Sequence, residues 1–219
     1  MIKGIFQPFK RDELLLGKDI TPEVFSKYQN WVNAPKAQEE LKGIAASLAP
    51  MYEWFEQKLD ETANATHTHN VMKNTGVKRL ASAVGKIIDK HAIEHKDHYT
   101  FSDMTDWIRG TLIAKDETLA RHALSYIEKN WKIADKPIDY FKHPNKGYRG
   151  LHVIVDLPNG LRGEIQIHTP ESLSYKLETM KEYEKYGYKK FSQMPDNIKD
   201  KLEQESKKYF HETPAGKPV

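Results

Sequence analysis

Hydrophobic residues recur at helical spacing through the first third of the chain. Thr21-Pro22 is a typical helix start, and the apolar residues that follow it return every three or four positions. After an interruption at Ala34-Pro35, a second apolar stripe predicts a helix over Gln38–Leu59, which Pro50 should kink or divide. A third helix is predicted over Val77–His95. The first third of the chain is therefore predicted to be helical.

The second half of the chain contains patterns that alternate with period two. The clearest are Leu151–Leu157 and Leu161–His168, which are joined by Pro158-Asn159-Gly160 and so predict a β-hairpin. Further recognisable segments are a strand over Trp107–Ala114, a helix from Asp116, an irregular strand over Lys132–Tyr140 and helices over 170–187 and 195–209. This order of helices, strands and helices predicts an α+β fold in which a mixed β-sheet is flanked by helices.

Composition excludes several classes of protein. With 38% hydrophobic and 11% aromatic residues in 219, the chain can bury a core and is too apolar for a disordered protein. No apolar run approaches the ~18 residues of a membrane span, and the first residues lack the apolar core of a secretory signal. Cysteine is absent, which excludes disulfides and is typical of a reducing compartment. We therefore expect a cytoplasmic protein that does not cross a membrane.

The predicted hairpin carries a row of polar side chains. Alternation places Glu164, Gln166 and His168 on one face of the second strand, and His152 lies on the same face of the first. A solvent-facing sheet surface would give the same pattern. The loop before the first strand, which contains Lys146 and Tyr148, combines ammonium groups, a glycine and an aromatic ring. Such a loop can bind phosphates and stack on a base, although a solvated loop that ends in a core tyrosine remains an alternative.

Two further groups of residues could act on a polyphosphate. Lys78, Ser82 and Lys86 are spaced four apart, so on one helix they would point the same way and form a clamp. Lysines at this spacing are also common on exposed helices. Asp106, at the start of a buried-looking strand, could present a metal ligand with Arg109 nearby, or it could simply cap a turn or pair with that arginine. Several histidines could suggest a metal site but are more typical of surface polar residues, namely His67, His69, His91, His95 and His98.

Together these segments resemble the synthetase domain of RelA/SpoT-type alarmone synthetases. The resemblance covers about residues 76–190 and depends on four segments in the right order. They are Lys78-x3-Ser82-x3-Lys86, the Asp106 strand, Lys146-Gly147-Tyr148-Arg149-Gly150-Leu151-His152, and Glu164-Ile165-Gln166-Ile167-His168-Thr169. The resemblance implies a nucleotidyltransferase-related fold and the transfer of pyrophosphate from ATP to the 3′-hydroxyl of a nucleotide.

The resemblance also implies roles for individual residues. Asp106 and Glu164 match the acidic residues that hold Mg²⁺, and Glu164 also helps to activate the attacking hydroxyl. Lys78 and Lys86 match the lysines on the ATP phosphates, with Ser82, Arg109 and Lys146 assigned to the same phosphate-binding group. Tyr148 matches the aromatic residue that stacks on the acceptor base, with His152 and Gln166 in the same pocket. Asp103 competes with Asp106 for the metal role, since the alignment there is not forced.

Four positions depart from the family pattern. Gly76 and Thr111 stand where arginines are common, Ile138 where a lysine is frequent, and His168 where an arginine usually precedes the threonine. Arg79 or Arg109 could replace the lost positive charge. Substrate choice is therefore less well determined by the resemblance than the type of reaction.

The chain resembles a single-domain small synthetase. We expect a helical N-terminal extension over 1–70, the synthetase domain over 71–210 and a loose tail over 211–219. A guanine nucleotide (GDP or GTP) is the leading acceptor, which would make (p)ppGpp. Toxin-type action on adenine nucleotides or the tRNA 3′ end, and a non-catalytic nucleotide- or RNA-binding module, are the alternatives. A homo-oligomer, an inhibitory protein partner and tRNA remain open as partners. A tRNA would need a basic surface, which the C-terminal lysines could supply although acidic residues are interleaved with them: Lys185, Lys189, Lys190, Lys199, Lys201, Lys207 and Lys208.

Overall fold

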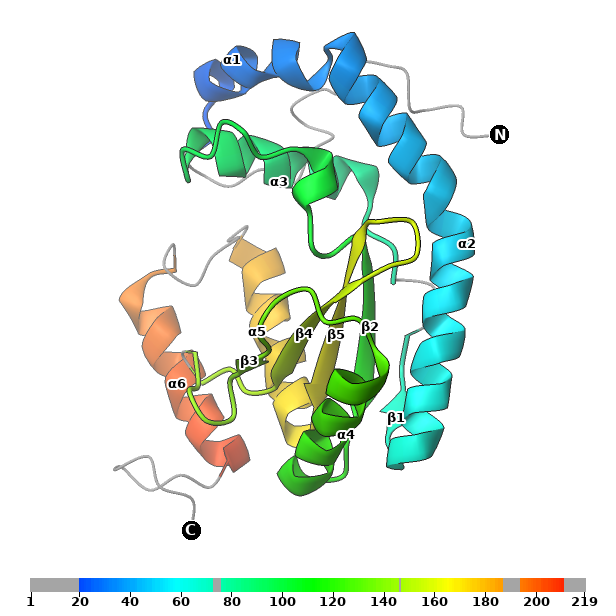
Figure 1. Ribbon diagram of the computed structural model, residues 1–219. Coiled ribbons are helices and arrows are strands. Elements are labelled where there is room, and N and C mark those ends of the chain that lie inside the picture. The colour runs from blue at the N-terminus through cyan, green and yellow to red at the C-terminus, as the bar shows by residue number, and fades with distance from the viewer. Residues whose placement is uncertain (1–19, 73–75, 146, 187–193, 211–219) are drawn as a thin grey trace.

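The computed structural model describes residues 20–72, 76–145, 147–186 and 194–210 (Figure 1). The elements in chain order are α1 (Pro22–Val32), α2 (Pro35–Thr66), β1 (His69–Asn70), α3 (Leu80–Ala92), the 3₁₀ turn η2 (Phe101–Asp103), β2 (Ile108–Ile113), α4 (Glu117–Asn130), β3 (Ile138–Asp139), β4 (Leu151–Asp156), β5 (Arg162–His168), α5 (Pro170–Tyr186) and α6 (Asp196–Phe210). The predicted α+β class is confirmed. None of the helices in these ranges has the length and apolar character needed to cross a membrane.

The five strands form one mixed sheet in the order β1-β2-β5-β4-β3. β2 and β5 run parallel in its centre, and the other neighbours are antiparallel. β4 and β5 form the predicted hairpin, whose turn is closed by a hydrogen bond from the Gly160 amide to the Leu157 carbonyl. Gly160 has a φ of +83°, a conformation that glycine adopts without strain and that is typical of three-residue hairpin loops.

Helices α1 and α4 begin where their capping residues predict. The hydroxyl of Thr21 accepts a hydrogen bond from the Val24 amide at the start of α1, and the carboxylate of Asp116 caps α4 through the Leu119 amide. Of the two effects predicted for Pro50, division of the helix does not occur, because α2 runs through Pro50 as one helix that bends along the sheet (Figure 1). Pro50 and Ala46, whose carbonyl loses its usual partner, are both exposed, and water can satisfy that carbonyl.

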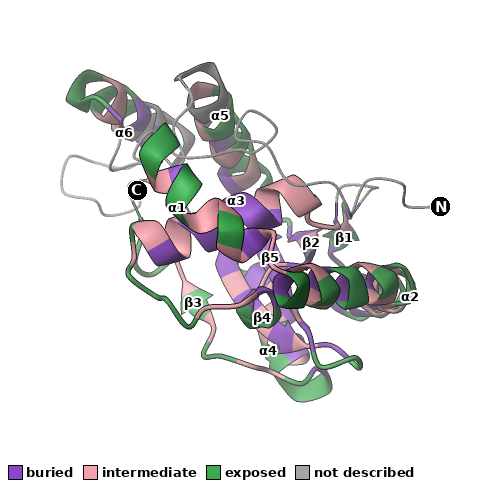
Figure 2. Ribbon diagram, turned by 90° about the horizontal axis from the view of Figure 1, so that it is seen from above, coloured by how far each residue is buried: buried purple, intermediate pink, exposed green. Residues whose placement is uncertain are grey.

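One face of the sheet is covered by α2 and α4, and buried residues gather between these helices and the strands (Figure 2). Phe55 and Leu59 of α2 are fully buried there. They pack so closely on β2 that a Cβ on Gly110 would lie 2.3 Å from a methyl carbon of Leu59. The N-terminal helices thus share one hydrophobic core with the sheet. The predicted boundary at residue 70 stays a prediction, and the predicted tail over 211–219 lies outside the described residues.

Candidate functional site

The face of the sheet opposite α2 and α4 is polar at its centre. In the strand register, Arg109 lies beside Glu164 and His152 lies beside Gln166. The predicted common face is therefore confirmed. It is not a plain solvent-facing surface, because α5 packs against β5 and both Gln166 and His168 are buried.

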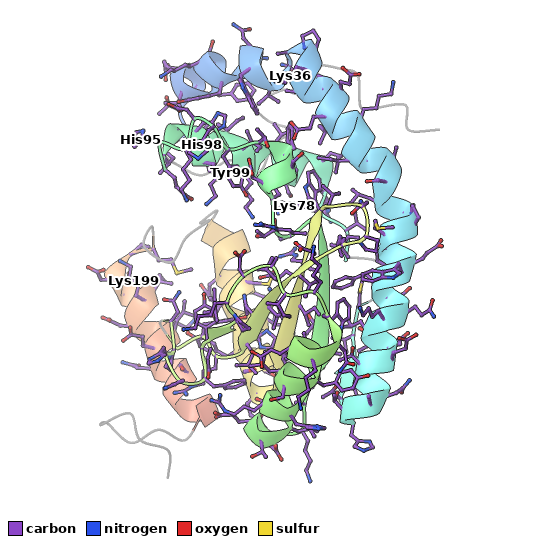
Figure 3. The ribbon with its side chains drawn as sticks, viewed as in Figure 1. Lys36, Lys78, His95, His98, Tyr99 and Lys199 are labelled. Carbon is purple, nitrogen blue, oxygen red and sulfur yellow. The ribbon has the colours of Figure 1, made fainter. Side chains whose placement is uncertain are left out.

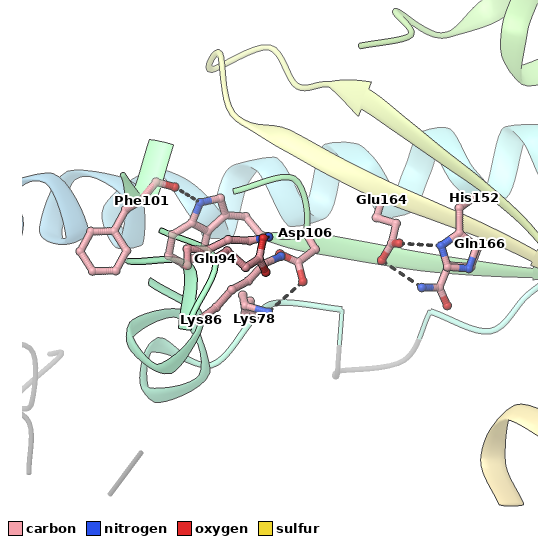
Figure 4. A network of polar contacts seen from close by, with 10 residues as sticks. Lys78, Lys86, Glu94, Phe101, Asp106, His152, Glu164 and Gln166 are labelled. Carbon is pink, nitrogen blue, oxygen red and sulfur yellow. Dashed lines mark hydrogen bonds and ion pairs between the residues drawn. The ribbon is translucent and has the colours of Figure 1, made fainter. Parts of the chain in front are cut away.

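Glu164 accepts hydrogen bonds on both of its carboxylate oxygens (Figure 4). His152 Nδ1 lies 3.0 Å from Oε1, and Gln166 Nε2 donates to Oε2 over 2.9 Å. Burial raises the pKa of Glu164, but the hydrogen bond from His152 and the charge of Arg109 outweigh burial and leave the pKa lowered. Glu164 is therefore ionised at neutral pH.

Asp106 lies in the turn before β2 and binds two lysines. Lys78 Nζ is 2.8 Å from Oδ2, and Lys86 Nζ is 2.7 Å from Oδ1. Burial opposes ionisation of Asp106, but the two ammonium groups outweigh it and lower its pKa to about 2. Burial also lowers the pKa of Lys78, against the attraction of Asp106. The result is a compact cluster of one carboxylate and two cations, as Figure 4 shows.

The two lysines reach Asp106 from different elements, which corrects the predicted helical row. α3 begins at Leu80, so Lys78 precedes the helix. The Lys78 amide instead donates to the Trp107 carbonyl, which holds the segment against the start of β2. At Lys78, backbone pairing with the segment before β2 outweighs helix propensity. Ser82 lies in the first turn of α3 and is partly exposed.

Asp106 and Asp103 have different partners in the structure. The carboxylate of Asp103 accepts hydrogen bonds from the amide and hydroxyl of Thr100, each at 2.8 Å, and so closes a capping box around η2. Asp106 pairs with lysines and not with Arg109, which is exposed on β2. Among the described residues, no three His, Cys, Asp or Glu side chains gather as a metal-binding group. His91 is buried, with its Nε2 2.6 Å from the Tyr99 carbonyl.

Tyr148 continues the polar network beyond His152. Its hydroxyl lies 2.5 Å from His152 Nε2 and 3.2 Å from His168 Nε2. Its ring makes an edge contact with Tyr140, with 5.3 Å between centroids. Burial raises the pKa of Tyr148, so the hydroxyl stays protonated and can donate. Lys146, expected in the same loop, lies outside the described residues.

His168 lies fully buried at the end of this network. Its Nδ1 is 2.9 Å from the hydroxyl of Ser172. Burial lowers the pKa of His168 to about 3, so the imidazole is neutral at neutral pH. The position that often holds an arginine in the resembled family therefore carries no charge here.

Two residues near the site were missed by the sequence analysis. Lys176 of α5 donates a hydrogen bond to Gln166 Oε1, and no sequence pattern marked it, because the contact depends on how α5 packs on β5. Tyr99 lies at the same end of the sheet as Lys78 (Figure 3), and burial together with the charge of Asp106 raises its pKa to about 12. Tyr99 had no sequence signal, because it lies in an irregular segment between α3 and η2.

The structure leaves little space for a side chain at Gly76. A Cβ there would lie 2.7 Å from the terminal methyl of Met72 and 3.0 Å from the backbone carbonyl of Arg109. An arginine at this position would therefore displace the end of the Met72 side chain and press on the Arg109 carbonyl, so it is disfavoured. Ile138, which stands where the resembled family frequently has a lysine, is 48% exposed on the edge strand β3.

The basic C-terminal surface is only partly described. Lys199, labelled in Figure 3, pairs with Asp196, and Lys201 pairs with Glu182. Both lysines are thus partly neutralised by neighbouring carboxylates. The side chains of the remaining lysines proposed for this surface lie outside the described residues.

Comparison with known families agrees with this geometry. A family model described as "Region found in RelA / SpoT proteins" matches residues 75–190, which is more than half of the chain. The chain belongs to the RelA/SpoT family. The match covers both carboxylates, Lys78, Lys86 and the hairpin. The search of curated proteins gave no significant match.

Solved structures show the same fold. The small alarmone synthetase 1 from Bacillus subtilis, bound to its product pppGpp, has a TM-score of 0.61 at 20% identity, over 77% of this chain and 91% of that chain. A GTP pyrophosphokinase family protein from Streptococcus pneumoniae has a TM-score of 0.58 at 20% identity, with 81% and 89% covered. The type VI effector Tas1, solved in complex with its immunity protein, has a TM-score of 0.52 at 18% identity, with 81% and 96% covered.

Proposed function

We propose that the protein is a Mg²⁺-dependent pyrophosphokinase that transfers pyrophosphate from ATP to the 3′-hydroxyl of a guanine nucleotide (GDP or GTP), making (p)ppGpp. The observation that carries this proposal is the pair of ionised carboxylates, Asp106 and Glu164, at one end of the polar sheet face. Three cations accompany them, with Lys78 and Lys86 on Asp106 and Arg109 beside Glu164. Such a site suits a polyphosphate that carries a divalent cation.

The side chains present fit a Mg²⁺ ion. Mg²⁺ prefers carboxylate oxygens and keeps several waters, and it is usually held by one or two carboxylates together with substrate phosphates. Asp106 and Glu164 offer such oxygens, and both carry lowered pKa values that keep them charged. Bound there, the ion would neutralise phosphate charge and polarise the phosphorus under attack. The ammonium groups of Lys78 and Lys86 would then move from Asp106 to the phosphates of ATP.

The residues of this chain would act mainly by positioning and charge. The acceptor 3′-oxygen forms a bond to the β-phosphorus of ATP while the bond from that phosphorus to the α–β bridging oxygen breaks, and AMP leaves. Glu164 accepts a hydrogen bond from the 3′-hydroxyl and takes its proton as the new bond forms. Because its pKa is lowered, Glu164 is a weak base, and removal of the proton is late.

The acceptor pocket would lie beside Glu164. His152, Gln166 and Tyr148 surround this carboxylate in one connected network. We propose that the Tyr148 ring stacks on the acceptor base, as the family resemblance implies. The small alarmone synthetase 1 from Bacillus subtilis has been solved both with its product pppGpp and with AMPCPP, which supports a nucleotide-binding role for this site.

A toxin-type synthetase is the second candidate. Gly76 stands in a tight space where the resembled family often has an arginine near the donor base, and Tas1 is among the structural neighbours. This candidate would use adenine nucleotides or the tRNA 3′ end as acceptor. It would also give the protein an inhibitory protein partner, while a homo-oligomer is compatible with either candidate.

An acceptor panel tests the proposal. The protein is incubated with γ-labelled ATP and Mg²⁺ and with GDP, GTP, AMP, ADP, ATP or tRNA in turn. Label should move to GDP or GTP, and Glu164→Gln should lower the rate by at least about 10² because a metal ligand and a base are lost together. Glu128→Gln serves as the control, because Glu128 is an exposed residue of α4 and undergoes the same chemical change. Transfer to adenine nucleotides or tRNA would establish the second candidate. Absence of transfer to every acceptor would favour a non-catalytic nucleotide-binding module.

A further inference from the structure

α5 places a lysine beneath the polar face of the sheet, next to the acceptor side of the site. We propose that Lys176 is a positioning residue, whose ammonium group fixes the carboxamide of Gln166 and, through it, the carboxylate of Glu164. The inference rests on the proposed function, because it concerns the orientation of Glu164 during transfer. Lys176 lies outside the segments that carry the family resemblance, and it is reached only through the packing of α5 on β5.

Two successive hydrogen bonds link Lys176 to Glu164 through Gln166, and the donor and acceptor of each bond are fixed. Lys176 Nζ donates to Gln166 Oε1, and Gln166 Nε2 donates to Glu164 Oε2 over 2.9 Å. An ammonium group can only donate hydrogen bonds, and an ionised carboxylate can only accept them. The amide of Gln166 therefore has one favourable orientation. Rotation by 180° would bring its NH₂ group against the ammonium and its oxygen against the carboxylate.

Burial of Gln166 keeps these hydrogen bonds from being exchanged for hydrogen bonds to water. Gln166 is 6% exposed, so neither end of its amide can turn to bulk water for a partner. Glu164 is held on its other oxygen by His152 Nδ1 at 3.0 Å. With both oxygens anchored, the carboxylate has one orientation in which to meet the acceptor hydroxyl.

The charge of Lys176 is available at neutral pH. Burial, with the repulsion of Arg109, lowers its pKa to about 8, while Glu164 opposes the shift. The neighbouring His168 is neutral and the other cation near Glu164, Arg109, is exposed on β2. Lys176 is thus the described ammonium group that binds Gln166, and a partly buried lysine without such a partner would be costly to retain.

Kinetics of Lys176→Met test the inference. Methionine keeps the apolar stem and removes the ammonium group. We expect kcat to fall at least tenfold, with KM for ATP and for the acceptor each changing less than threefold, because misorientation of a reacting group acts on the chemical step. The control is Lys181→Met on the same helix, where the lysine is exposed and pairs with Glu178, and its kcat should stay within twofold of wild type. A raised acceptor KM with an unchanged kcat would overturn the inference and make Lys176 a substrate contact.

A double-mutant cycle tests whether Lys176 acts through Gln166. If it does, Lys176→Met should add less than a twofold loss in a Gln166→Leu background. Losses that multiply in the double variant would show that Lys176 acts by another route, which overturns the inference. Melting temperatures of all four proteins identify any variant whose loss comes from unfolding.

A readout without turnover separates this inference from the proposed function. The side-chain amide resonances of Gln166 can be assigned in an NMR spectrum by their loss in Gln166→Leu. Lys176→Met should shift both amide protons, while Lys181→Met should leave them in place. Unshifted resonances would overturn the inference. If wild-type protein transferred label to no acceptor, the proposed function would fail, and this spectrum would still decide whether Lys176 holds Gln166.

Discussion

Replacing Asp106 by asparagine tests the centre of the site. The change is nearly isosteric, but it removes the charge that holds two ammonium groups. Lys78 and Lys86 now bind opposite oxygens of the carboxylate at 2.8 Å and 2.7 Å. An asparagine offers one oxygen to accept from one lysine and an NH₂ group that faces the other. Two partly buried cations would then lie close together without a counter-charge.

The expected loss of stability is about 2–4 kcal/mol. Removing one member of a fully buried ion pair costs about 3–5 kcal/mol, and this site is less buried, with 14% of the Asp106 side chain and 28% of the Lys86 side chain exposed. The lowered pKa of Asp106, about 2 against an ordinary 3.8, corresponds to about 2 kcal/mol by linkage. Burial of Lys78, which lowers its own pKa, offsets part of this gain. For a chain of this size the melting temperature should fall by about 5–15 °C.

The matched control is Asp103→Asn, three residues upstream. Asp103 is exposed and accepts hydrogen bonds only from Thr100 among the contacts described, and asparagine can accept them as well. Its loss should stay below about 1 kcal/mol. In the transfer assay, Asp106→Asn should lower turnover by about 10² or more, because a metal ligand is lost, while Asp103→Asn should stay within threefold of wild type.

The contribution of Asp106 to stability should depend on pH. The folded-state pKa of Asp106 lies below its unfolded value, so its stabilisation is present above pH 3.8 and is lost as the pH falls toward 2. The stability difference between wild type and Asp106→Asn should therefore be constant from pH 5 to 7 and shrink in acid. Equal melting temperatures for wild type and Asp106→Asn at pH 7, or a larger loss of turnover in Asp103→Asn, would refute this account of the cluster.

Three further outcomes are expected. Lys78→Ala and Lys86→Ala should each raise KM for ATP by the equivalent of roughly 1.5–3 kcal/mol, and an unchanged dependence of rate on ATP would show that neither lysine binds phosphate. Tyr148→Ala should raise the acceptor KM by one to two orders of magnitude, as expected for about 1–3 kcal/mol of stacking, with ATP use little altered and Tyr148→Phe retaining much of the activity. A large fall in melting temperature without an acceptor-selective defect would contradict that role. His168→Gln should flatten the fall in stability on acidification, because the pKa of buried His168 is lowered to about 3, so protonation of the unfolded chain removes stability below pH 6.5. Thermal melts at pH 7 and 5.5 measure this, with about 1 kcal/mol lost in wild type and not in the variant; equal slopes would exclude His168 as the titrating group.

Local features of the fold could be predicted from the sequence because their causes are local. The β4–β5 hairpin follows from period-two alternation and a turn that suits Gly160, and the helix starts follow from the caps at Thr21 and Asp116. Alternation also placed Glu164 and His152 on one face, since side chains in paired strands must share a face at facing positions.

Contacts between distant segments were decided only by the tertiary structure. Lys78 lies outside α3 because its backbone pairs with the segment before β2, and no local pattern records that pairing. Asp106, and not Asp103, pairs with Lys78 and Lys86 because only its carboxylate lies within reach of both lysines in the folded chain. Lys176 reaches Gln166 only because α5 packs across β5. The sequence alone thus determined the β4–β5 hairpin, the caps of α1 and α4 and the polar face, whereas the charges that surround each carboxylate depend on how the helices pack on the sheet.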